Sequence, residues 1–273
     1  MSEASTPRAE PSSRVAIARL ESRRHVRGAA VLSAVLSVFA ILYVAIFPDM
    51  KAEAAQIVEI LPAFLLEMFG LEALDTIEGF IAAEMYSFFW TVLVGAYFAY
   101  LGAGMIAVDV HDRRMDLTLA NPVSRESVVG QKVAALWAPL AILNFPVWFV
   151  IVAGSTLVGE PVDVVALAMV HVLSIPYLLA CAGLGLVLSV VLGHPRRSRG
   201  AAVAMVILLW LIDTVSRLSP DSEWIGWLTP SRYYAYTAIL VRNEYDLVNA
   251  VALLVGALAL VGLATALFVR RDI

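Results

Sequence analysis

Residues 164–192 read VVALAMVHVLSIPYLLACAGLGLVLSVVL and contain no Asp, Glu, Lys or Arg. A helix needs roughly 20 apolar residues to cross the hydrocarbon core of a bilayer, so this stretch is long enough to span a membrane. Four other stretches are uncharged over a comparable length, namely residues 28–47, 85–108, 133–158 and 248–269. The pattern predicts an integral membrane protein whose spans are α-helices.

A sixth candidate span, residues 201–218, is the least regular. It is uncharged only as far as Ile212, and Asp213 and Arg217 stand before its end. The composition fits many spans, because 61% of the 273 residues are hydrophobic, 15% are charged and the mean hydropathy is +0.83. Such values lie outside the usual range of water-soluble domains. We therefore predict an all-α integral membrane protein with six transmembrane helices.

Basic residues assign the loops to the two sides of the membrane, since Lys and Arg near span ends are retained in the cytoplasm. The sequence has 19 Lys and Arg residues, and six spans place fifteen of them on one face. Six lie before residue 28, four in 109–132, three in 193–200 and two at the C-terminus. Segment 48–84, on the other face, holds eight acids and one lysine. The charges predict that the N- and C-termini are both cytoplasmic.

The N-terminal 27 residues divide into two parts. Residues 1–12 are rich in Ser, Thr, Pro and Glu, which predicts a disordered cytoplasmic tail. Residues 13–27 place apolar side chains among five arginines. This pattern is typical of a basic helix lying at the cytoplasmic interface, and a plain charged flank is an equal alternative. Residues 28–273 are expected to form one six-span transmembrane domain.

Two segments are expected on the outer face. Apolar residues recur at helical spacing between Asp49 and Glu84, which predicts one or two amphipathic helices. Residues 219–247 contain a cluster of aromatic residues, Trp224, Trp227, Tyr233, Tyr234 and Tyr236. Amphipathic rings of this kind suit the level of the lipid headgroups. An aromatic belt is therefore favoured over a substrate gate.

Four polar side chains within or at the ends of the spans could act in a translocation pathway or in helix packing: Asn144, His171, Asp213 and Arg217. Asp213 and Arg217 are four residues apart, which favours an ion pair along one helix over a role in a pathway. His171 is either a proton relay or a hydrogen-bonding partner of a neighbouring helix, and the structural role is favoured. Asn144 is expected to bond another helix near a kink at Pro146.

Motifs for catalysis and nucleotide binding are absent from the sequence. It has no G-x-x-x-x-G-K-[ST] loop, no H-E-x-x-H pattern and no G-x-S-x-G elbow. The single cysteine, Cys181, lies in an apolar stretch, which excludes an intramolecular disulfide or a Cys-rich metal site. We expect no catalytic residues, no bound cofactor, no metal and no nucleic-acid partner. If transport is active, another subunit supplies the energy.

The segment between the second and third spans, residues 109–132, reads DVHDRRMDLTLANPVSRESVVGQK. Its start is charged, its middle is apolar, and Asn121-Pro122 indicates a turn. Ser124 is a suitable N-cap for a short helix that continues into the next span. A compact helical hairpin on the cytoplasmic face is suited to docking on another protein. A simple connector between two spans would not need such a pattern of charges, turn and cap.

This segment resembles the permease subunits of ABC transporters, specifically the second class of ABC exporter permeases, which includes bacitracin, sodium and copper-processing systems. In that family an acidic cluster, a Gly-Thr pair, a leucine-rich stretch, Pro-Val-Ser-Arg and Gly-Lys follow the second span. The matching positions are Asp109, Asp112, residues 116–119, Pro122, Val123, Ser124, Arg125, Gly130 and Lys132. Arg113 and Arg114 stand where the family has Gly-Thr.

The resemblance covers nearly the whole chain. The outer segment is similar to the Leu-Pro…Phe-Gly…Glu-Gly-Phe pattern of the family, and the chain ends in a similar basic motif. These positions are Leu61, Pro62, Phe69, Gly70, Glu78, Gly79 and Phe80, and then Arg270, Arg271, Asp272 and Ile273.

The resemblance implies a transport subunit in the plasma membrane of a prokaryote, paired with a second permease copy in a homodimer or related heterodimer. Two copies of a separate ABC ATPase would hydrolyse ATP and drive substrate movement, with export expected. The family places the ATPase contact in residues 112–132. The implied docking residues are Asp112, Arg113, Arg114, Asp116, Pro122, Val123, Ser124 and Arg125.

Two other functions stay open on the residues alone. One is a membrane-embedded enzyme using His171 and Asp213, which requires these side chains within direct or water-bridged reach of each other. The other is an assembly subunit that does not transport. A largely apolar interior fits lipids, drugs, peptides or a small ion equally well, so the sequence does not select a substrate.

Overall fold

The computed structural model describes residues 16–62, 65–66, 71, 73–120, 123–218 and 220–271. Within these ranges every regular element is a helix, and six stretches are long and apolar enough to cross a membrane. They are Ala16–Ile60, Ile77–His111, Arg125–Leu157, Val164–Leu192, Pro195–Ser216 and Leu247–Val269. The predicted all-α fold with six spans is confirmed. The irregular fifth span is a continuous helix that begins before the predicted residue 201.

Several predictions concern residues outside the described ranges. These are the tail at 1–12, the first residues of the basic segment at 13–15, the pattern residues Phe69 and Gly70, Pro122 in the inner loop, and the terminal Asp272 and Ile273. The basic residues from 16 to 27 are helical, and they continue into the first span without a break in α1 (Ala16–Ile60).

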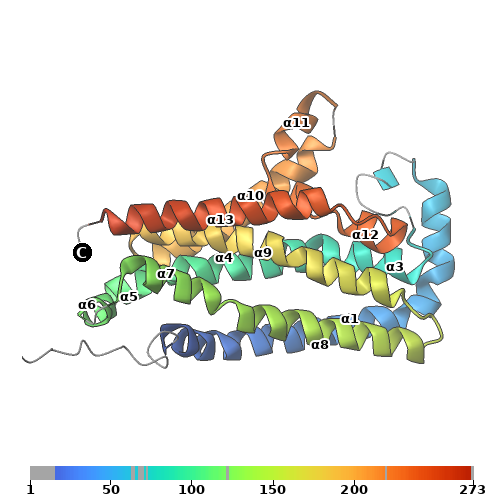
Figure 1. The fold of residues 1–273 in the computed structure, drawn as a ribbon. Helices are drawn as coiled ribbons and strands as arrows, with labels where there is room; N and C mark the ends of the chain where they lie inside the picture. Colours follow the sequence, from blue (N-terminus) through green and yellow to red (C-terminus); the bar gives the residue numbers. More distant parts are fainter. Residues whose placement is uncertain are drawn as a thin grey trace, which may run out of the picture.

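α1 extends well past the first span. Pro48 lies inside this 45-residue helix, and a proline removes a backbone hydrogen bond and commonly bends a helix. Figure 1 shows the part of α1 after the bend turning across one end of the bundle. This part covers the start of the second span.

The second span is made of successive helical segments. They are α3 (Ile77–Ile81), the π-helical η2 (Ala82–Val94), α4 (Gly95–Gly104) and α5 (Ala107–His111). Two short helices follow, α6 (Arg114–Leu119) and α7 (Arg125–Ala134), and α8 (Trp137–Leu157) completes the third span.

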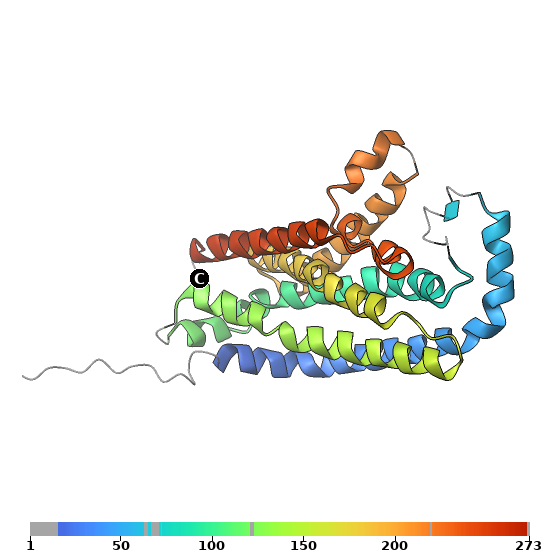
Figure 2. The ribbon, with the colours of Figure 1, turned by 45° about the vertical axis from the view of Figure 1, so that its right-hand side comes forward.

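The second half of the chain contains the central helix of the bundle. α9 (Val164–Leu192) contacts α4, α10 (Pro195–Ser216), α12 (Tyr236–Arg242) and α13 (Leu247–Val269). The remaining elements are the 3₁₀ turns η3 (Pro220–Ser222) and η4 (Pro230–Tyr233) and the short helix α11 (Glu223–Gly226). Figures 1 and 2 show α11 projecting away from the rest of the bundle.

The aromatic cluster of the outer loop divides into two groups. Trp224 and Trp227 are exposed, as expected for rings at the headgroup level. Tyr234 is buried, stacks on Tyr177 of α9 with ring centroids 5.5 Å apart, and donates to the carbonyl of Val170. The loop is therefore anchored on α9 by its buried tyrosine.

The start of α1, the α5–α6–α7 segment and the end of α13 all lie at the same end of the bundle (Figures 1 and 2). Helix contacts agree, because α7 touches both α1 and α13. This end holds the described members of the fifteen basic residues that the sequence assigns to one face. The charged α5–α6–α7 segment thus contacts the first and last spans, and it continues into the third span at this end of the bundle.

Candidate functional site

The α5–α6–α7 hairpin, residues 107–134, is built by local signals in its sequence. Arg113 joins α5 to α6 in the left-handed conformation, with φ 55° and ψ 22°. This conformation favours glycine, so Arg113 holds a turn that a glycine would form with less strain. Ser124 caps α7, its Oγ accepting from the Ser127 backbone N–H at 3.1 Å.

The hairpin has one buried face and one exposed face. Met115 of α6 is fully buried, as are Val128 and Val129 of α7. On the opposite face Leu117 is 71% exposed, and Arg113 and Asp116 are also exposed. An exposed face that combines apolar and charged residues on a firmly packed base is suited to protein contact.

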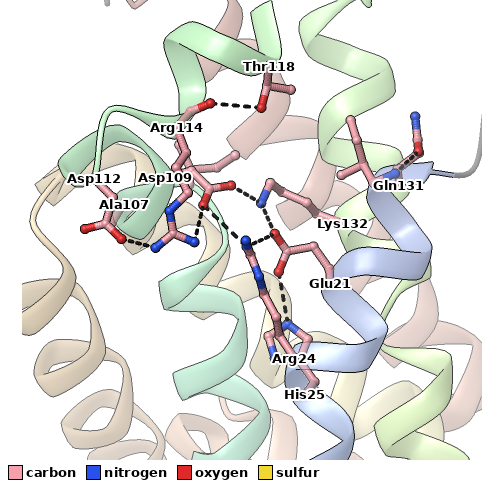
Figure 3. A network of polar contacts seen from close by, with 12 residues as sticks. Glu21, Arg24, His25, Ala107, Asp109, Asp112, Arg114, Thr118, Gln131 and Lys132 are labelled. Carbon is pink, nitrogen blue, oxygen red and sulfur yellow. Dashed lines mark hydrogen bonds and ion pairs between the residues drawn. The ribbon is translucent and has the colours of Figure 1, made fainter. Parts of the chain in front are cut away.

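Lys132 of α7 is buried at the base of the hairpin and holds two carboxylates. Its Nζ donates to Glu21 Oε1 of α1 at 2.8 Å and to Asp109 Oδ2 of α5 at 2.6 Å. The Lys132 side chain is 2% exposed, and those of Glu21 and Asp109 are 9% and 10% exposed. Figure 3 shows the ammonium group between the two carboxylates. One side chain therefore connects three helices.

Two arginines surround this ion cluster. Arg24 donates to Glu21 at 2.9 Å and lies 3.7 Å from an Asp109 oxygen. Arg114 of α6 lies 3.9 Å from the same Asp109 oxygen and also pairs with Asp112. Attraction between charges strengthens where water is excluded, and a buried ion left without its partner is costly. The cluster consequently resists separation of α1 from the hairpin.

Arg125 joins the hairpin to the last span. Its Nη1 donates to the carbonyl oxygens of Phe268, Val269 and Arg271 at 2.9, 3.2 and 2.6 Å. The last carbonyls of a helix have no partner within the helix and carry partial negative charge, so a guanidinium there satisfies both needs. Arg271 in turn donates to the Val190 carbonyl near the end of α9.

The implied docking residues therefore take different positions. Arg113 and Asp116 are exposed, and Asp112 pairs with Arg114. Ser124 caps α7, and Val123 is partly buried against the core. Arg125 bonds to backbone carbonyls at the end of α13. Sequence reasoning missed Glu21 and the buried position of Lys132. An isolated acid within a strongly basic segment was the available signal for Glu21.

The polar residues of the spans lie in separate places. His171 Nδ1 is 3.0 Å from Asn144 Oδ1 and its Nε2 is 2.8 Å from the Tyr86 hydroxyl. Asn144 also donates to the Leu140 carbonyl, which orients its amide so that Oδ1 faces the histidine. His171 thus links α9 to α8 and η2, with both ring nitrogens in hydrogen bonds.

Asp213 pairs along its own helix. Arg217 Nη2 lies 3.0 Å from Asp213 Oδ2, the ion pair that the four-residue spacing favours. The hydroxyl of Ser216 donates to the Asp213 carbonyl at 2.7 Å. His171 bonds to Tyr86 and Asn144, and Asp213 bonds to Arg217, so the hydrogen bonds of the described residues do not join the two residues of the enzyme alternative.

These features define a class of protein: a helical membrane protein with six candidate spans and a charged hairpin fixed to its first and last spans. A comparison with protein-family models identifies it further. The model of the ABC-2 family transporter proteins matches residues 15–273, and the chain belongs to that family. It is a transport membrane subunit of the permease type. No curated protein sequence matches the chain.

Proposed function

We propose that this permease couples to a separate ABC ATPase through the exposed face of the α5–α6–α7 hairpin, and that the two together move a substrate across the plasma membrane. One observation carries the proposal. The hairpin exposes Arg113, Asp116 and Leu117 while its base is tied to α1 by Lys132 and to α13 by Arg125. A partner that displaces the hairpin therefore pulls on two transmembrane helices.

The transmission is direct because the connections are short, and the one made by Lys132 is buried. α7 leads into α8 through a turn at residues 135–136, so movement of the hairpin also tilts the third span. Lys132 transfers the same movement to α1, and Arg125 transfers it to the carbonyl end of α13. Packed helices and buried ion pairs shift between discrete arrangements rather than deforming continuously, which suits a pathway that switches sides.

The orientation of the proposed complex follows from charge. The hairpin end of the bundle contains most of the basic residues, and basic loops stay in the cytoplasm where ATP is available. The sequence has no phosphate-binding loop, so the partner hydrolyses the nucleotide. We further propose a second permease copy beside this one and, from the family resemblance, transport outward.

Two alternatives have less support. An enzyme built on His171 and Asp213 would need the two groups to act on one substrate, but their hydrogen bonds run to different partners. An assembly subunit without transport would not need a buried ion cluster between its cytoplasmic hairpin and its first span. A permease coupled to an ATPase accounts for the buried ion cluster and does not require His171 and Asp213 to act together.

Arg113→Gly tests the docking face. The change removes an exposed guanidinium and gives the left-handed turn the residue that fits it best, so the hairpin is expected to keep its shape. We expect the tagged permease to retain an ABC ATPase when purified from its host. The variant should bind that ATPase about ten-fold more weakly, a typical loss for an interfacial arginine.

Arg197→Gln is the matched control, because Arg197 is exposed at the same end of the bundle but lies outside the hairpin. It should bind the ATPase as the wild type does. Equal ATPase binding by wild type and Arg113→Gly would show that the contact lies elsewhere. Purification without any nucleotide-binding subunit would contradict the proposed function itself.

A further inference from the structure

A cavity of about 360 Å³ lies beside the ion cluster, between the start of α1, the end of α4 and the start of α10. Its charged lining is Arg24, Arg114, Lys132 and Arg199 with Glu21 and Asp109. Lys132 and Arg24 bond to the acids of the cluster and Arg114 pairs with Asp112, whereas no ion pair to Arg199 is found among the described residues. The lining therefore has two positive charges more than it has negative ones.

Arg199 is held in an unusual position within this lining. Its guanidinium lies over the ring of Tyr100, with its central carbon 4.4 Å from the ring centroid. It also lies against Gly104, where an added Cβ would come 2.7 Å from Nη2. The absence of a side chain at Gly104 thus makes room for the arginine at the wall of the cavity.

The Nε–H of Arg199 lacks a hydrogen-bond acceptor within the part of the chain that the structure describes, although the atom is buried. Buried donors are nearly always paired, and a charged donor without a partner is especially costly. Guanidinium groups also match the oxygens of a phosphate in a planar, two-bond geometry. The site therefore supplies positive charge and a guanidinium donor that the described residues leave without an acceptor.

We propose that this cavity binds the phosphate group of an anionic ligand, with Arg199 as the principal donor and Arg24 and Arg114 supplying further positive charge. The proposal concerns binding alone and does not depend on the ATPase or on transport.

The surroundings favour a lipid as the source of the phosphate. Tyr97, Tyr100, Leu101 and Met105 complete the wall on the side of α4, where the second span ends. Tyrosines and arginines together are typical of the headgroup level of a bilayer. An anionic phospholipid would place its phosphate among the arginines and its first methylene groups along the apolar wall. Free phosphate offers the same oxygens without the apolar contact.

The test measures ligand binding to the purified full-length chain in detergent by native mass spectrometry. The probes are dioleoylphosphatidylglycerol, dioleoylphosphatidylcholine and inorganic phosphate. We expect phosphatidylglycerol to bind at least about ten-fold more tightly than phosphatidylcholine. Both lipids carry the phosphate, but the trimethylammonium group of phosphatidylcholine neutralises it and is repelled by the arginines of the lining. Tighter binding of phosphatidylglycerol than of inorganic phosphate identifies the lipid, whereas equal affinity identifies free phosphate as a sufficient ligand.

Two variants locate the site. Arg199→Gln removes the charge, and Gly104→Ala keeps every charge but displaces the guanidinium from its position. Each should weaken phosphatidylglycerol binding about ten-fold, while Arg197→Gln, an exposed position on the same helix, should not change it. Size-exclusion profiles matching that of the wild type verify folding. Unchanged binding in both Arg199→Gln and Gly104→Ala, or equal affinity for the two lipids together with no phosphate binding, would overturn the proposal.

Discussion

Lys132→Met is expected to destabilise the permease by about 3–5 kcal/mol, the usual cost of removing one partner from a buried ion pair. Methionine fills much of the space of lysine but leaves Glu21 and Asp109, at 9% and 10% exposure, without the buried ammonium group between them. The partly exposed Arg24 is then the nearest cation to both. The measurement is thermal unfolding of the purified protein in detergent, followed by the fluorescence of its six tryptophans.

The chain provides a matched control for this variant, because its only other lysine is Lys51. Lys51 pairs with Glu160 at 2.7 Å, but these side chains are 46% and 30% exposed. Exposed pairs contribute about 0–1 kcal/mol, so Lys51→Met should change stability little.

A second comparison separates lost charge from lost packing. Replacing Glu21 and Asp109 by Gln and Asn in the Lys132→Met background removes the two carboxylate charges that have lost the Lys132 ammonium group and should recover more than half of the lost stability. A Lys132→Met variant as stable as Lys51→Met would contradict the view that the buried cluster joins α1 to the hairpin.

Gly185→Ala is expected to cost about 3 kcal/mol, at the upper end of the usual penalty for overpacking. A Cβ at Gly185 of α9 would overlap the carbonyl oxygen of Ala99 in α4 and would lie 2.8 Å from the backbone nitrogen of Ala103. Both obstructing atoms belong to the backbone, so the two helices must move apart. Thermal unfolding under the same conditions measures the effect.

Gly262→Ala serves as the control for the glycine change. Gly262 lies in α13, and an added Cβ would meet nothing within 4 Å in this chain. Alanine is the better helix former, so the stability of this variant should stay equal to the wild type or rise slightly. A similar melting temperature for both glycine variants would show that the close approach of α4 and α9 is not needed.

Periodicity and charge counts were sufficient to predict the spans. Apolar length is a local property, and the distribution of Lys and Arg reports the number of crossings without knowledge of any contact. Small residues at Gly95, Ala99 and Ala103 also predict close helix packing, but their spacing does not distinguish packing within one chain from packing between copies. The structure places Ala99 and Ala103 against Gly185 of α9, inside the chain.

The site was harder to predict because its contacts join residues far apart in the sequence. Glu21 and Lys132 are separated by 111 positions, and Arg125 reaches carbonyls more than 140 positions away. Nothing in the local pattern of α7 says that Lys132 is fully buried while Gln131 beside it is only partly buried. The hairpin was recognised from its turn and cap signals, whereas the anchors at its base required the fold.

The contacts in the structure change the interpretation of two residues of the hairpin, Arg125 and Arg113. Arg125, implied as a docking residue, caps the end of α13, so its substitution would disturb the bundle as well as a docking surface. Arg113, at the position where the resemblance implied a Gly, adopts the left-handed conformation. Arg113 is therefore the better position at which to test docking.

The central claim is that the hairpin contacts an ATPase, and photo-crosslinking in native membranes tests it most directly. A photoreactive amino acid replaces Asp116, exposed on the hairpin, or Leu157, which is 86% exposed where α8 ends. We predict that an ABC ATPase is crosslinked from residue 116 and not from residue 157. Crosslinking of the ATPase from residue 157 alone, or from neither position, would contradict the account.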